Sequence, residues 1–124
     1  MTHQADRDVD VLERALISVR AGNEDAFEAA YAKAVAYLRG AAGCRDVRLL
    51  RGVEDPSTYL LLVRWATLED HTVGFRQSAA FGQWRALLGE HFASPPQVEH
   101  YQPLADATGL APGSSNGEGS GGAG

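Results

Sequence analysis

The stretch TYLLLVRW (58–65) constrains the fold more than any other part of the sequence, because it is apolar on both faces of an extended chain. Successive side chains of a β-strand point to opposite faces of the sheet. A strand with one face in water would therefore alternate between apolar and polar residues. This stretch does not alternate, so we expect a central strand that is covered on both sides.

A core-facing helix is predicted to follow Asn23, its expected N-cap. Glu24 and Asp25 stand in the first turn, where the helix dipole favours anions. Gly40 is expected to end the helix. One helix face carries apolar residues at positions i, i+3, i+4, i+7, i+8 and i+11, which are Phe27, Ala30, Tyr31, Ala34, Val35 and Leu38.

Three further strands are predicted. Residues 11–20 are rich in β-branched and apolar side chains, with Glu13, Ala15, Ile17 and Val19 on one side. Residues 44–53 alternate as a second strand, and the turn EDPS (54–57) joins them to the central strand. Residues 97–104, after the break SPP, form the last strand.

A second helical segment is predicted after the central strand. Thr67 and Asp70 form an imperfect capping box, which starts a short helix. Ser78 is a second N-cap, so the helix is expected to kink there. The buried stripe of the second part then runs to about residue 92 and consists of Phe81, Trp84, Leu87, Leu88 and Phe92.

The resulting β-α-β-β-α-β order is that of an α+β ferredoxin-like fold, with two helices on one face of a four-stranded antiparallel sheet. The other face would stay exposed and partly apolar, which favours a twofold homodimer with the sheets face to face. We expect this domain to span residues 10–104. Residues 1–9 are predicted to be a flexible arm, and the Gly/Ser-rich residues 105–124 a disordered tail.

Composition excludes several classes of protein. The net charge of the 124-residue chain is −5 and its basic residues are scattered, which argues against nucleic-acid binding. The single Cys44 cannot form an internal disulfide and fits a reducing compartment. The start of the chain lacks a signal peptide, and no apolar run is long enough to cross a membrane. We therefore expect a soluble cytoplasmic protein.

One block of the sequence combines three features. A strand ends in Trp, a capped helix with an acid follows, and a second helix cap precedes two aromatic residues. The residues of this block are Trp65, Thr67, Glu69, Ser78, Phe81 and Trp84. This block and the closing VEHY resemble the antibiotic biosynthesis monooxygenase family over about residues 11–103. The resemblance implies a dimeric α/β-barrel. It leaves the reaction open, because this fold serves oxygenases, haem degraders, cyclases and proteins of unknown role.

The haem-degrading branch of that family carries an Asn on the first strand, a Trp within the second helix and a haem-ligating His near the end of that helix. By position these sites fall near Ala15, at Gly74 or Phe75, and at Arg85 or Ala86, and none of the three matches. His91, about one turn further along, keeps this alternative open.

The cofactor-free, quinone-forming branch is similar in its Trp at the end of the third strand, which is Trp65 here. The Asn expected four residues earlier is Leu61, and the Tyr expected six residues later is His71. This resemblance implies a monooxygenase that needs no cofactor. Its substrates would be O2 and a phenolic or polycyclic aromatic molecule, such as an anthrone or hydroquinone.

Such a reaction requires a base, a donor for the substrate anion and a dry pocket. We expect His71 to be the base or proton shuttle, Trp65 the donor and stacking wall, and Arg76 the anion holder. The indole of Trp65 and the imidazole of His71 are expected to open into one cavity between the sheet and the helices. Its predicted lining is Tyr59, Leu61, Val63, Phe27, Tyr31, Phe75 and Phe81.

Structural roles remain open for each of these residues. Trp65 is also a plausible strand-end core residue, His71 a solvated side chain, and Arg76 an anchor for the kink. His100 and Tyr101 are expected at a dimer interface or at the sheet edge. The histidines lack metal-ligand spacing, so no metal site is predicted. A non-catalytic ligand-binding or interaction module and a cyclase are the other functions that the sequence allows.

Overall fold

The computed structural model describes residues 10–104. The predicted arm (1–9) and tail (105–124) lie outside the described residues. Strands and helices follow the predicted order: β1 (Val11–Ser18), α2 (Glu24–Arg39), β2 (Cys44–Arg51), β3 (Thr58–Trp65), η1 (Asp70–Phe75), α3 (Ala79–Leu88), η2 (Gly89–His91) and β4 (Gln97–Tyr101).

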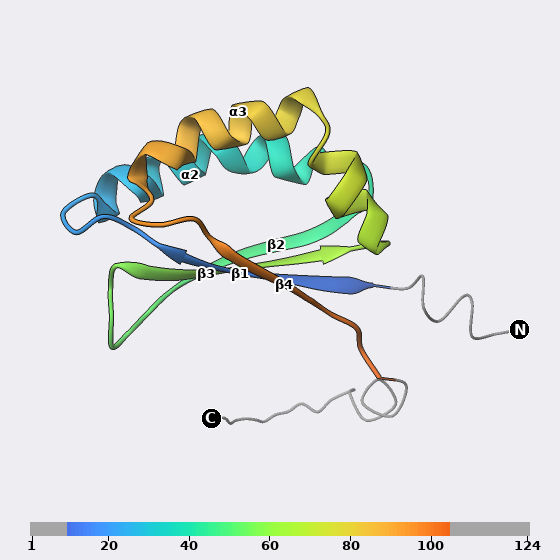
Figure 1. Ribbon diagram of the computed structural model, residues 1–124, viewed down its shortest axis with the longest axis horizontal. Helices are drawn as coiled ribbons and strands as arrows, with labels where there is room; N and C mark the ends of the chain where they lie inside the picture. The colour runs from blue at the N-terminus through green and yellow to red at the C-terminus, as the bar shows by residue number, and fades with distance from the viewer. Residues whose placement is uncertain (1–9, 105–124) are drawn as a thin grey trace, which may run out of the picture.

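The four strands form one antiparallel sheet in the order β2-β3-β1-β4. Helices α2 and α3 pack side by side across one face of the sheet, and η1 covers the end of that face (Figure 1). The α+β ferredoxin-like fold predicted from the sequence is confirmed. As predicted from the apolar run TYLLLVRW, β3 lies inside the sheet between β2 and β1. The cover expected on both of its faces is found, within residues 10–104, only on the face towards the helices.

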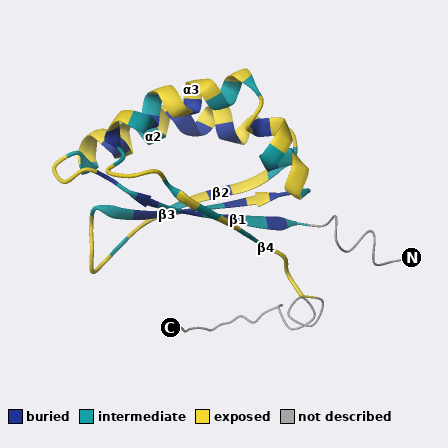
Figure 2. Cartoon of the chain, viewed as in Figure 1, coloured by how far each residue is buried: buried dark blue, intermediate teal, exposed yellow. Residues whose placement is uncertain are grey.

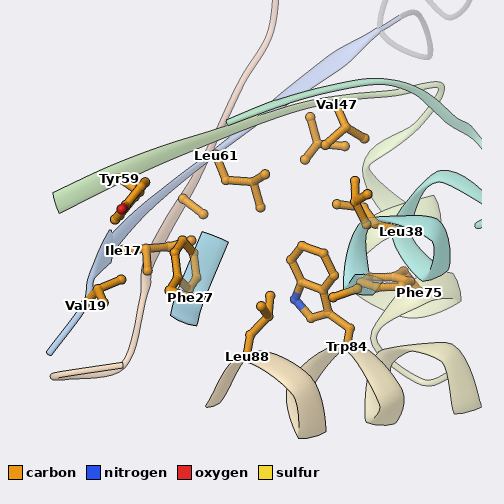
Figure 3. Close-up of a cluster of buried hydrophobic side chains, with 14 of the residues drawn as sticks. Ile17, Val19, Phe27, Leu38, Val47, Tyr59, Leu61, Phe75, Trp84 and Leu88 are labelled. Atoms are coloured by element: carbon orange, nitrogen blue, oxygen red, sulfur yellow. The ribbon is translucent and has the colours of Figure 1, made fainter. Parts of the chain in front are cut away.

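The core lies between the sheet and the two helices (Figures 2 and 3). The side chains of β3 that point to the helices are fully buried: Tyr59, Leu61, Val63 and Trp65. They meet Phe27 and Leu38 from α2 and Trp84 and Leu88 from α3. The apolar stripes of both helices thus cover this face of β3.

The opposite face of the sheet is only half covered. Leu60 and Leu62 of β3 alternate with the buried row and are partly exposed. Leu60 pairs with Leu16 on one side and with Leu50 on the other, and Leu50 is 40% exposed. Within residues 10–104 this leaves a partly apolar patch that no helix covers, as the sequence suggested.

Both predicted helix starts after β3 are formed. The backbone N–H of Thr67 donates to Asp70 Oδ2 at 3.2 Å, and that of Asp70 donates to Thr67 Oγ1 at 3.1 Å, which completes a reciprocal capping box. Ser78 Oγ accepts from the N–H of Phe81 at 3.2 Å and caps α3. The expected kink is the turn between η1 and α3.

Two details of the helices differ from the prediction. Asn23 precedes α2, but its side chain does not cap the helix, because it hydrogen-bonds to His91 instead. The second helix ends at Leu88 rather than near residue 92. Phe92 is extended because its backbone forms a β-bridge with Val19.

A close contact at Gly43 fixes the start of η1. Gly43 has φ of +85°, and a Cβ built there would lie 2.0 Å from Asp70 Oδ2. Gly43→Ala should therefore strain the backbone and also displace the carboxylate of the capping box. Gly22 is the matched control, because its φ is +91° and a Cβ there meets nothing within 4 Å.

We expect Gly22→Ala to cost roughly 1 kcal/mol of stability for its left-handed backbone alone. Gly43→Ala should cost about 1 kcal/mol more, the typical value of a lost helix cap. Urea denaturation of the two variants and the parent measures both losses. Equal losses would show that the contact between Gly43 and Asp70 does not stabilise the fold.

Candidate active site

A cavity of about 580 Å³ lies between the sheet and the helices. Its floor is the helix-facing side of β1 with Leu61 of β3, and its roof comes from η1 and α3. Segment 92–96 and Val98 of β4 complete the wall. Most lining side chains are apolar, and a few polar groups converge among them: Glu13, His71, Arg76 and Arg85. This combination is typical of a small-molecule site.

Glu13 is the acidic group of this cavity. Strand alternation puts it in the row of Val11, Ala15 and Ile17 that faces the helices, and only 5% of the residue is exposed. Its Oε1 accepts a hydrogen bond of 2.9 Å from Trp65 Nε1. The Nε2 atom of His71 lies 3.4 Å from the same oxygen. Both contacts use the same oxygen, Oε1.

His71 lies between Trp65 and the last strand. Its ring stacks on the indole of Trp65, with centroids 5.2 Å apart and planes inclined by 18°. Its Nδ1 lies 2.8 Å from Nε2 of His100 on β4. The ring is 4% exposed, so both of its nitrogens face protein groups rather than bulk water.

The local backbone explains why η1 and the residue after it, Arg76, reach the cavity. The N–H of Arg76 donates to the carbonyl of His71 at 3.1 Å, which is the wide i to i+5 turn of a π-helix. This wide turn lets His71, Phe75 and Arg76 all contribute to the cavity wall. Short π-helical turns are common at functional sites.

Burial sets the protonation of these groups. It raises the pKa of Glu13 above its usual 4.5, against the hydrogen bond from Trp65 and the charge of Arg76. Burial lowers the pKa of His71 to about 4, and the charges of Arg76 and His100 act in the same direction. The pKa of His100 is lowered by burial and by Arg76. At neutral pH both rings are therefore uncharged, and the Glu13 carboxylate is a stronger base than the His71 imidazole.

Five of the predicted site residues line the cavity: Leu61, His71, Phe75, Arg76 and Phe81. Trp65 does not. It is fully buried behind His71, and its N–H is already bound to Glu13. The expectation that both rings open into one cavity therefore holds for His71 alone.

The other four predicted lining residues lie elsewhere in the core. Tyr59 and Phe27 pack together with ring centroids 4.7 Å apart, and Tyr59 donates its hydroxyl proton to Glu28 (Figure 3). Tyr31 contacts the edge of Trp84. Val63 is fully buried. Tyr59 and Val63 do point from β3 to the helices, and Phe27 and Tyr31 come from helix α2. The cavity, however, lies towards β1 and β4 rather than along the whole of β3.

Two residues of this site were missed by the sequence interpretation. Glu13 is the one charged residue among the helix-facing positions of β1, and this break in an apolar row was a usable signal. His100 lies on the edge strand β4, as expected, but its side chain turns to His71 under the helices. Tyr101 is 48% exposed and donates to Glu99.

His91, which kept the haem alternative open, is not among the cavity-lining residues. Its Nδ1 lies 3.2 Å from the amide nitrogen of Asn23, and its Nε2 lies 3.6 Å from Glu90. Within residues 10–104, no group of three or more His, Cys, Asp or Glu side chains could hold a metal ion. None of the helices in this range is long and apolar enough to cross a membrane.

Comparison with known proteins decides the family. The sequence model described as "Antibiotic biosynthesis monooxygenase" matches residues 11–87, which is more than half of the chain. The chain belongs to the antibiotic biosynthesis monooxygenase family. The matched range includes Glu13 and His71 and ends before His100.

Similar proteins agree with this family. The uncharacterized protein YczJ of Bacillus subtilis is 41% identical over 92 residues, which are 74% of this chain and 97% of that protein. A solved structure from Bordetella bronchiseptica that bears the family's name is 47% identical. The TM-score is 0.75, and the matched region covers 77% of this chain and 98% of the Bordetella bronchiseptica chain.

A more distant structural neighbour is SnoaB from Streptomyces nogalater, described as a cofactor-independent oxygenase. It is 16% identical to this chain and has a TM-score of 0.68, with 77% of this chain and 94% of SnoaB covered. At that identity the likeness concerns the fold.

Proposed function

We propose that this family member is a monooxygenase that oxidises a phenolic or polycyclic aromatic molecule, such as an anthrone or hydroquinone, with O2 and without a cofactor. One observation carries the proposal. A buried carboxyl, Glu13, faces an apolar cavity of about 580 Å³ beside His71 and Arg76. The family supports monooxygenase chemistry in general terms.

An oxygenase without flavin or metal must obtain its electrons from the substrate. An anthrone or hydroquinone becomes electron-rich enough to reduce O2 once it has lost a proton. For an anthrone, the ring CH2 becomes a carbonyl and the second oxygen atom leaves as water, so atoms and electrons balance. The protein must take up the first proton, stabilise the resulting anion and exclude bulk water.

The polar groups of the cavity match these tasks. Glu13 takes the proton, because its raised pKa makes it a better base than an ordinary carboxylate. Arg76, which lines the same cavity, holds the substrate anion. Phe75 and Phe81 pack against the aromatic rings of the substrate.

Trp65 and His71 act behind Glu13 in this scheme. The indole N–H of Trp65 fixes the carboxylate, which makes Trp65 a positioning residue rather than a stacking wall. His71 is the proton shuttle, because its Nε2 faces Glu13 Oε1. The proposal is supported by SnoaB, a protein of this fold that is described as a cofactor-independent oxygenase.

Oxygen uptake with 1,8-dihydroxyanthrone tests the proposal. The parent protein should consume O2 and form the quinone, and kcat/KM should rise with pH through a midpoint above 4.5, the usual value for Glu13. The carboxylate is the active form, so activity is lost as pH falls through its raised pKa. Glu13→Gln should lower kcat by about 10²–10⁴-fold, the usual contribution of a general base.

The exposed Glu54→Gln is the matched control and should leave the rate unchanged. A parent protein that binds the anthrone without consuming O2 would contradict the proposal and favour a ligand-binding module. Conversion without oxygen uptake would favour a cyclase. An active Glu13→Gln variant would remove Glu13 from the reaction.

We also propose that the protein is a homodimer in which the two sheets pack face to face. The support is the uncovered patch around Leu60 and Leu62, which a second copy would bury. Leu62→Glu should convert the dimer into a folded monomer, because this side chain points away from the helices. Val53→Glu, at a turn residue that is 88% exposed, is the control.

Sedimentation velocity of the parent and of both variants measures the mass, and circular dichroism checks the fold. A monomeric parent, or a Leu62→Glu variant that stays dimeric, would contradict this arrangement.

A further inference from the structure

We infer that Glu13, His71 and His100 form a proton relay that carries the substrate's proton from the main cavity to a second pocket on the other side of His71. The inference rests on the proposed function, because the relay resets Glu13 after each deprotonation. It adds the path along which the proton leaves Glu13 and the place where it reaches water.

The three groups form a continuous chain of polar contacts. Glu13 Oε1 lies 3.4 Å from His71 Nε2, and His71 Nδ1 lies 2.8 Å from His100 Nε2. Each imidazole thus offers one nitrogen to the group before it. The residues come from β1, η1 and β4, which are brought together only in the folded chain.

The two ends of this chain open into different spaces. Glu13 and His71 line the main cavity, whereas His100 lines a second pocket of about 380 Å³ with Thr67, Glu69 and Gln102. His71 is absent from the second pocket and His100 is absent from the main cavity. The contact between the rings therefore connects two spaces that share no lining residue.

The proton balance of the relay is simple. Glu13 takes one proton from the substrate and passes one to His71 Nε2, while His71 Nδ1 passes its own proton to His100 Nε2. His100 Nδ1 releases a proton to water in the second pocket. One proton enters, one leaves, and Glu13 is again a carboxylate. Rotation of the two imidazole rings then restores the starting tautomers.

The surrounding charges favour transfer of the proton through the two imidazoles and disfavour a stable protonated ring. Arg76, the residue that follows η1, is a positive charge that acts on Glu13, His71 and His100. It disfavours a resting imidazolium on either ring, while Glu69 lines the exit. Burying the carboxyl of Glu13 and the imidazole of His71 costs free energy that an apolar pair would not, which argues for a functional role.

Chemical rescue separates a relay from a structural role. His100→Ala should lower kcat for 1,8-dihydroxyanthrone at least tenfold with little change in KM, because binding in the main cavity is intact. Imidazole added to the buffer should restore the rate as its concentration rises, since it can accept the proton from His71. Glu13→Gln, which lacks the base itself, should not be rescued. Full activity of His100→Ala without imidazole would overturn the relay.

Nitrogen-15 NMR of histidine-labelled parent protein tests the relay without turnover. We expect a scalar coupling across the hydrogen bond between His71 Nδ1 and His100 Nε2, and Glu13→Gln should shift the resonances of both rings. Absent coupling with independent titration of the rings would overturn the relay even in an active enzyme. Present coupling in a parent that consumes no O2 would instead count against the proposed oxygenase function alone.

Discussion

Glu13 stands on the helix-covered face of β1, where a carboxyl group is stable only if other polar groups meet it. Trp65 supplies a hydrogen bond from the neighbouring strand, and His71 approaches the same oxygen from η1. These contacts in turn fix their own partners, because the imidazole stacks on the indole and reaches His100 with its second nitrogen. The polar centre of the cavity thus depends on how one acid is accommodated in an apolar layer.

The backbone around η1 serves the same requirement. Asp70 closes the capping box with Thr67 and lies directly over Gly43, so the segment begins at a defined point after β3. The wide turn that follows brings His71 and Arg76 to one wall, where a regular α-helical turn would separate them. Residues outside the cavity lining therefore determine where the imidazole of His71 and the guanidinium of Arg76 lie.

Much of the fold could be predicted from the sequence because its signals are local. The two-faced run at 58–65 identified the central strand, and Thr67 and Ser78 marked both helix starts after it. The neighbourhood of Trp65 and His71 was also predictable, since six positions separate them. Glu13 and Trp65 are 52 positions apart and His71 and His100 are 29 apart, so their contacts follow only from the strand order β2-β3-β1-β4.

The pKa of the Glu13 carboxyl is the most direct test of this account. Carbon-13 NMR of protein labelled at the glutamate carboxyl carbons measures it, with the resonance assigned by its loss in Glu13→Gln. The account predicts a midpoint above 4.5, because burial outweighs the hydrogen bond from Trp65 and the charge of Arg76. A midpoint at or below 4.5 would mean that burial does not raise the pKa of this carboxyl, and it would contradict the role of Glu13 as the base.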